Sequence, residues 1–133
     1  MILLDTHVLL WLKDAPHHIG RNGFARLESA LAAGEVWLSV ISFWEIAMLA
    51  RKRKIRVTVP LARWRMELAS RKVIEIPLDG LTAAQAGALD WAHGDPADRI
   101  LVATAMRLGL PLLTADQKIL GWGGPVEVID ARA

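Results

Sequence analysis

Residues 1–12 read MILLDTHVLLWL, and this stretch decides which fold the chain can adopt. The apolar run from Ile2 to Leu4 has the length of a short buried strand, and it ends at Asp5. From Thr6 onward the apolar residues follow helical spacing instead. We therefore expect a strand, a tight turn that carries an acid, and a helix, which together form the repeating unit of a parallel sheet covered by helices.

The same alternation continues along the rest of the chain. Short apolar runs predict further strands at 36–38, 73–76, 112–114 and 126–129. Between them, Ser42 and Glu45 have the spacing of a capping box at the start of a helix. Asp95 and Pro96 predict the start of another helix, which Gly109 ends. Because no hairpin signal lies between the strands, the chain is predicted to be α/β, a parallel sheet with helices on both faces.

The composition limits the kinds of site and the location of the protein. The chain has 133 residues, of which 53% are hydrophobic and none is cysteine. A core can form at this length without disulfides, and the absence of cysteine excludes thiolate zinc sites, iron–sulfur clusters and cysteine nucleophiles. No apolar run approaches the roughly 18 residues that span a bilayer, and the first residues lack a signal-peptide pattern. We expect one cytoplasmic domain over residues 1–133, without membrane attachment.

Basic residues are concentrated in one segment of the chain. The net charge is only +2, but nine of the sixteen Lys and Arg residues fall between Arg51 and Lys72. Such a patch attracts nucleic-acid phosphates without reading bases. The residues that we expect to contact nucleic acid are Arg51, Lys52, Arg53 and Lys54. The alternative is that these four only complement the negative end of a helix.

Four carboxylates fall where predicted strands end or predicted helices begin. Asp5 follows the first strand, and Asp116 follows the strand at 112–114. Glu45 and Asp98 lie in the first turns of two predicted helices. Since ligands in open α/β sheets bind beyond the carboxyl ends of the strands, we expect all four to share one cleft. Each also has a purely structural interpretation as a helix cap or turn residue.

The position of Asp98 indicates the chemistry of that cleft. One stripe of its predicted helix holds Asp98, Leu101, Ala105 and Leu108. The carboxylate therefore points inward, where several acids repel one another unless a cation compensates them. An acidic, all-oxygen site suits Mg²⁺ or Mn²⁺, which also recruit substrate phosphate. Metal-dependent phosphodiester cleavage is the leading prediction.

Four segments together resemble the PIN-domain family. They are LLDTHVLLW at 3–11, SVISFWEIA at 39–47, DPADRILVATA at 95–105 and LLTADQKIL at 112–120. The resemblance implies a three-layer α/β/α sandwich whose central sheet is mainly parallel and has four to five strands. It implies a Mg²⁺- or Mn²⁺-dependent endoribonuclease with the acidic quartet Asp5, Glu45, Asp98 and Asp116. The shortness of the chain is similar to that of VapC-type toxins of bacterial toxin–antitoxin pairs.

The resemblance also implies roles for further residues. The implied metal ligands are Asp5, Asp98 and Asp116. The implied supporting polar residues are Thr6, Thr114 and Arg99. Asp95 offers a second acid beside Asp98, although capping explains it. His7 stands where many family members have Asn or Ser, and His93 shows no zinc-ligand spacing with the other histidines.

The implied partners are an RNA substrate, a second copy of the chain in a homodimer, and a cognate antitoxin. The antitoxin is expected to lie in a hydrophobic groove and to occlude the active site. Trp11 and Trp44 are candidates for that groove, against the alternative that they belong to the core. Two other functions fit the same residues. One is a PIN-domain nuclease for RNA processing or DNA without an antitoxin, and the other is a non-catalytic α/β module that binds nucleic acid or protein.

Overall fold

The central element of the protein is a five-stranded sheet in which every strand pair is parallel. The computed structural model describes residues 1–133. Its strands are β1 (Ile2–Leu4), β2 (Val36–Ser39), β3 (Ile74–Ile76), β4 (Leu112–Thr114) and β5 (Val128–Asp130). Their order in the sheet is β3-β2-β1-β4-β5. The α/β class, the parallel sheet and the strand number are as predicted.

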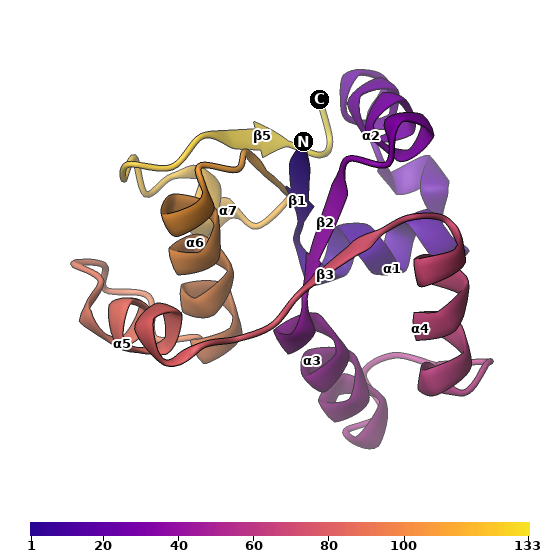
Figure 1. Ribbon diagram of the computed structural model, residues 1–133, viewed down its shortest axis with the longest axis horizontal. Helices are drawn as coiled ribbons and strands as arrows, with labels where there is room; N and C mark the ends of the chain where they lie inside the picture. Colours follow the sequence, from indigo (N-terminus) through magenta and orange to yellow (C-terminus); the bar gives the residue numbers. More distant parts are fainter.

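Helices cover both faces of this sheet, which makes a three-layer α/β/α sandwich (Figure 1). The helices are α1 (Thr6–Asp14), α2 (Arg21–Ala33), α3 (Val40–Arg51), α4 (Leu61–Ser70), α5 (Gly80–Ala88), α6 (Pro96–Leu108) and α7 (Gln117–Leu120), and a 3₁₀ turn spans Pro16–His18. None of them has both the length and the apolar character that crossing a membrane requires.

The alternation of side chains along β1 divides the core into two parts. Ile2 and Leu4 face one core cluster, which includes Leu27 of α2. Leu3 faces the other, which includes Leu101 of α6. All five side chains are fully buried, and burial of all three residues of β1 is expected for a strand that is covered on both faces. The apolar run that opens the sequence is therefore the centre of the molecule.

The start of α3 differs from the prediction. Ser39, the last residue of β2, is the N-cap, and its Oγ accepts a hydrogen bond from the backbone N–H of Ile41 (3.2 Å). The predicted Ser42 and Glu45 capping box is wrong, because the helix begins directly where the strand ends and both residues lie inside it. The Glu45 carboxylate consequently has no capping role.

The start of α6 is as predicted. Asp95 is the N-cap, and its Oδ1 accepts a hydrogen bond from the backbone N–H of Asp98 (3.0 Å), with Pro96 at the first helical position. Gly109 ends the helix with a φ of 64°, a left-handed conformation that favours glycine. The inward stripe is one residue shorter than predicted, since Leu108 in the last turn is 39% exposed.

Candidate metal centre

The chain changes direction across the sheet between β1 and β4. From β1 it proceeds to β2 and β3 on one side, and it then returns to β4 on the other. Such switch points leave a crevice at the carboxyl ends of the strands. Asp5 directly follows β1, and Asp116 follows β4 by two residues. Glu45 in α3 and Asp98 in the first turn of α6 come to the same end of the molecule.

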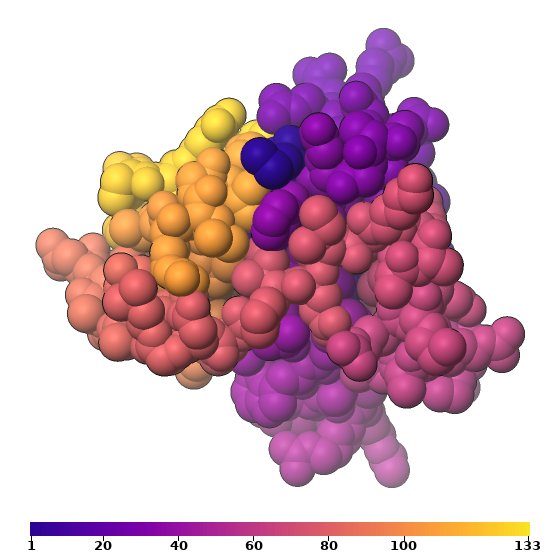
Figure 2. Space-filling model, in the orientation of Figure 1, coloured from indigo at the N-terminus to yellow at the C-terminus, as the bar shows by residue number.

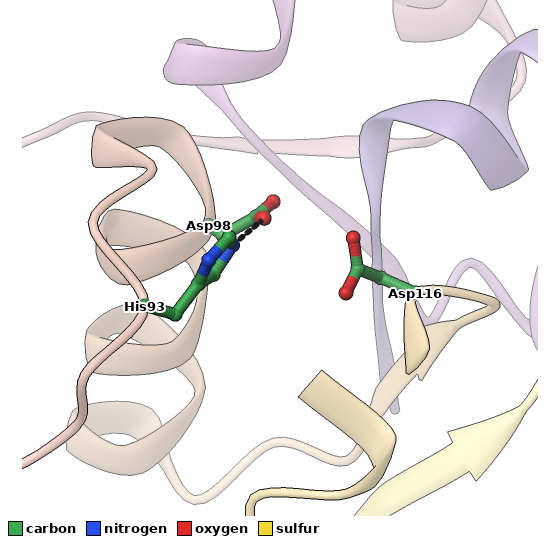
Figure 3. A group of neighbouring side chains, drawn as sticks. All are labelled: His93, Asp98 and Asp116. Carbon is green, nitrogen blue, oxygen red and sulfur yellow. Dashed lines mark hydrogen bonds and ion pairs between the residues drawn. The ribbon is translucent and has the colours of Figure 1, made fainter. Parts of the chain in front are cut away.

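Asp98 is the residue that the two candidate ligand groups share. One group consists of His93, Asp98 and Asp116, whose ligand atoms all lie within 4.8 Å of one another. Figure 3 shows the Asp116 carboxylate on a separate segment, across from the His93 and Asp98 pair. The second group consists of Glu45, Asp95 and Asp98, with the same spacing limit. Asp98 itself is buried, with 7% of its surface exposed.

Thr114 connects Asp5 to Asp116. Its hydroxyl donates a hydrogen bond to Oδ2 of Asp5 (2.6 Å) and accepts one from the backbone N–H of Asp116 (3.0 Å). Asp5 occupies the N-cap position of α1, yet its side chain makes no capping hydrogen bond. Asp116 does cap α7, through Oδ1 alone. Asp5 is therefore held by Thr114 rather than by a helix, and Asp116 keeps its other oxygen for a ligand.

Glu45 carries a buried carboxylate oxygen that has no hydrogen-bond partner. The atom is Oε1, and the residue is 7% exposed. Thr6 is close by, but its hydroxyl makes its 2.9 Å hydrogen bond with Oγ of Ser42, and Oε1 of Glu45 is left without a partner. An orphaned carboxylate oxygen in the interior is costly unless a cation or a proton satisfies it. The residues present thus fit a hard divalent cation, which prefers oxygen ligands.

Burial raises the pKa values of three carboxyl groups in this part of the molecule. Burial raises the pKa of Asp98 to about 7; the hydrogen bond from His93 opposes this increase, and the charges of Asp5, Asp95 and Asp116 add to it. Burial also raises the pKa of Asp5, against the hydrogen bond from Thr114. For Glu45, burial raises the pKa, the nearby Thr6 partly offsets it, and Asp5 raises it further. Ionisation of these carboxyl groups at neutral pH therefore places negative charges close together without a compensating positive charge.

Comparison with known proteins identifies the family of the chain. The family model described as PIN domain matches residues 2–120. This chain belongs to the PIN-domain family. The resemblance inferred from the four sequence segments is thereby confirmed, and the match covers all four acids of the predicted quartet.

The proteins similar to this PIN domain include one named as a ribonuclease and one described as a toxin–antitoxin complex. Ribonuclease VapC22 from Mycobacterium tuberculosis is 34% identical over 119 residues, which cover 89% of this chain and 88% of the relative. A toxin–antitoxin complex from Klebsiella pneumoniae has 25% identity and a TM-score of 0.66, with 98% of each chain covered. VapBC2 from Rickettsia felis, bound to a promoter DNA fragment, has 15% identity and a TM-score of 0.66 over 98% of this chain and 100% of its own, a likeness of fold alone.

Sequence reasoning missed His93 as part of the site of this PIN domain. Its Nε2 lies 2.6 Å from Oδ2 of Asp98, and both side chains are largely buried. The ring of Trp91 packs against it edge to face, with 4.8 Å between the centroids. The available signal was its position two residues before the helix cap Asp95, which brings it to the same helix end as Asp98. His7, in contrast, is exposed and acts on Asp5 and Glu45 only through its charge.

Arg99 faces away from the carboxylates of the PIN domain. Its guanidinium donates hydrogen bonds to five backbone carbonyls that precede α6, those of Ala86, Gly87, Leu89, Trp91 and His93. Because these donors all bind carbonyls of the segment before α6, we call Arg99 the clamp of this segment. It holds the backbone of His93 and thereby positions the imidazole beside Asp98.

We expect Arg99→Lys to lower the stability of the PIN domain by about 2 kcal/mol or more, because lysine cannot reproduce the planar fork of donors. Thermal unfolding measures this as a decrease of several degrees in Tm. Arg63→Lys is the matched control, since Arg63 makes only an exposed 3.6 Å ion pair with Glu67. Unchanged stability of Arg99→Lys, combined with loss of RNA binding, would contradict the clamp and favour a phosphate contact.

The basic segment of the PIN domain lies at the end of α3. Arg51 is the last residue of this helix, and Lys52, Arg53 and Lys54 form the exposed turn that follows. Figure 2 shows the chain around residue 50 projecting from the bottom of the molecule. All four side chains are exposed and make no ion pair within the chain.

Proposed function

We propose that this PIN domain is a divalent-metal-dependent endoribonuclease that acts as the toxin of a toxin–antitoxin pair. The observation that carries the proposal is the orphaned oxygen of buried Glu45 within two groups of potential ligands that share the buried Asp98. A fold keeps such a costly cluster when a ligand compensates it. The name of the relative VapC22 and the toxin–antitoxin complexes among the similar structures support ribonuclease and toxin as the specific roles.

The catalytic residues in this proposal are Asp5, Glu45, Asp98 and Asp116. Asp5, Asp98 and Asp116 would hold Mg²⁺ or Mn²⁺, and Glu45 would complete the set. When bound, the cation supplies positive charge that activates water and stabilises the charge that develops on the phosphate. Mg²⁺ and Mn²⁺ both suit a set of carboxylate oxygens.

Neighbouring side chains position these acids. Thr114 orients Asp5 through the 2.6 Å hydrogen bond, and His93 holds one oxygen of Asp98, which leaves the other free. Thr6 belongs to the same supporting layer through Ser42. These contacts reduce the freedom of the carboxylates before any ligand binds, and such preorganisation is what metal sites and transition states require.

We also propose that RNA approaches over the basic segment Arg51 to Lys54, because cations on a projecting surface attract phosphates over a distance. The protein partner in this proposal is an antitoxin that occludes the acids, and the chain pairs with a second copy. Trp44 supports an antitoxin surface, since it is 54% exposed and directly precedes Glu45. Trp11 is half-buried and stacks on His18, with 5.2 Å between the ring centroids.

The proposal predicts that the purified chain, freed of any co-purifying protein, cuts total cellular RNA at discrete positions in Mg²⁺ or Mn²⁺. EDTA should abolish the cuts, and Asp5→Asn should weaken them about 100-fold, because a charge is lost from the metal-binding set. Gel or sequencing analysis of the RNA ends gives the measurement. Asp14→Asn serves as the control, since Asp14 is exposed and is the last residue of α1, at the opposite end of that helix from Asp5.

Three outcomes separate the possible functions. Cuts that persist unchanged in Asp5→Asn would refute the acidic quartet. Intact RNA together with no metal binding by calorimetry would favour the interaction module. Metal-dependent cuts in a chain that no antitoxin inhibits would favour the processing nuclease.

A further inference from the structure

A cavity of about 610 Å³ opens beside the metal centre and has no role in the chemistry described so far. His93 belongs to both, because it lines the cavity and contacts Asp98. Gln117 and Lys118, which also line it, directly follow Asp116. Its volume lies within the range of about 300 to 1,000 Å³ that is common for small-ligand sites. The cavity therefore borders the proposed metal centre.

The wall of the cavity that carries His93 is aromatic. Trp91 and Trp122 line it and stack on one another, with 5.0 Å between ring centroids and an angle of 27° between the planes. Both indoles are partly buried against the core cluster of α6, which restricts their movement. The indole N–H of Trp122 already donates to the carbonyl of Asp90 (3.3 Å). This wall offers flat apolar surface, and flat surface of this kind suits a nucleobase.

The α7 side of the cavity is polar. Gln117 and Lys118 are exposed, and neither side chain makes a hydrogen bond or ion pair within the chain. An amide can donate to and accept from a base edge, and an ammonium group binds phosphate. Lys118 also follows Asp116 by only two residues. Its ammonium group is therefore placed to bind the phosphate next to the one that is cut.

We propose that this cavity holds one unpaired nucleotide of the RNA next to the scissile phosphate, with its base against Trp91 and Trp122 and its phosphate near Lys118. The inference rests on the proposed ribonuclease function and deepens it, because it names the residues that bind the nucleotide beside the cut. A base within a duplex is stacked between its neighbours, so its face is unavailable to an indole. We assign a nucleotide rather than a protein side chain as the occupant because the cavity borders the proposed metal site through His93 and carries the free cation Lys118.

The test uses a short synthetic single-stranded RNA that spans a cut found in cellular RNA. Abasic nucleotides replace the residues that flank the cut, one at a time, and the wild-type chain cleaves each version. We expect one position to raise KM about tenfold or more while kcat changes less than about twofold, because base stacking on an aromatic side chain is lost. This experiment needs no variant, so it does not depend on whether a mutated chain folds.

Protein variants then locate the effect. In Trp91→Leu, the increase in KM that the abasic nucleotide causes should be less than about twofold, since the base has already lost its stacking partner. Lys118→Ala should raise KM for RNA with all its bases, whereas Arg26→Ala should not. Arg26 is an exposed basic residue of α2 that makes no ion pair and lies outside the cavity.

The outcomes distinguish this inference from the proposed function. If the wild type cuts the intact RNA and no abasic position raises KM, the nucleotide subsite is refuted and the ribonuclease stands. An abasic penalty that persists in full in folded Trp91→Leu would place the base elsewhere and also refute the subsite. If the wild type cuts no RNA with either metal, the proposed function fails and this inference fails with it.

Discussion

Asp98→Asn is expected to lower metal-dependent RNA cleavage by roughly 1,000-fold or more. The reason is the shared position of Asp98, which contributes to both groups of potential ligands. Its replacement removes a charge from each group, whereas a change at Glu45 or Asp116 affects one. Removal of a single preorganised charge-stabilising contact costs about 100- to 1,000-fold in enzymes, and this residue serves two such contacts. Initial rates on a defined RNA in saturating Mn²⁺ give the measurement.

The loss should occur without damage to the fold. Asparagine has the shape of aspartate and can still accept the hydrogen bond from His93. It also removes a buried carboxyl group whose pKa burial raises to about 7, so at neutral pH and above the Tm of metal-free Asp98→Asn should equal or exceed that of the wild type. Undiminished cleavage by a folded Asp98→Asn protein would exclude the quartet as the catalytic set.

Asp95→Asn is the matched control within the same helix turn. Asparagine caps helices about as well as aspartate, so α6 should keep its N-cap bond to the backbone of residue 98. We expect cleavage to fall about tenfold or less, because Asp95 belongs to one ligand group only and already uses an oxygen as a cap. A loss as large as that of Asp98→Asn would instead make Asp95 a ligand of equal weight.

Mg²⁺ is expected to stabilise the protein strongly above pH 7 and hardly at all near pH 5. The folded pKa of Asp98 is about 7 against an ordinary value of 3.8, and burial raises those of Asp5 and Glu45 as well. Between these values the folded chain binds more protons than the unfolded chain. The contribution of these groups to the stability of the metal-free protein is therefore greatest below about pH 4, and it declines as the pH rises toward 7.

A bound cation reverses that decline because it needs the deprotonated carboxylates. The contribution of Asp98 alone is on the order of 4 kcal/mol, for a rise from 3.8 to about 7 at about 1.4 kcal/mol per unit of pKa. Thermal unfolding at pH 5, 6, 7 and 8, in EDTA and in Mg²⁺, should show two curves that diverge with pH. Metal-free Asp98→Asn should have a flatter pH dependence. Curves that coincide at pH 8 would contradict a metal site at these acids.

The order and character of the elements were predictable from local sequence. Apolar runs such as Ile2 to Leu4 are strands in the structure, and Asp95 with Pro96 starts α6, because propensity and capping depend on residues within one helical turn. The family followed from four local motifs. Even the expectation that Asp5 and Asp98 lie close together needed only the rule that ligands gather at the carboxyl ends of parallel strands.

The errors arose where two locally possible partners compete. The Ser42 and Glu45 spacing fits a capping box, but Ser39 takes the cap because β2 leads straight into α3. Arg99 is adjacent to Asp98 in sequence, yet on a helix consecutive side chains point about 100° apart. Its guanidinium therefore binds the carbonyls before α6, so the support that Arg99 gives to the acids acts through the backbone of His93 and not by direct contact.

The sequence by itself determined which groups the protein has for chemistry: a parallel α/β scaffold, four acids at strand and helix ends, and no thiol. Only the tertiary structure decided how those groups meet. It paired His93 with Asp98, left Glu45 Oε1 without a donor, and brought Trp91 against Trp122 across 31 positions of sequence. The reason is physical: caps and strands depend on neighbours along the chain, whereas burial and charge compensation depend on every segment that packs around a group.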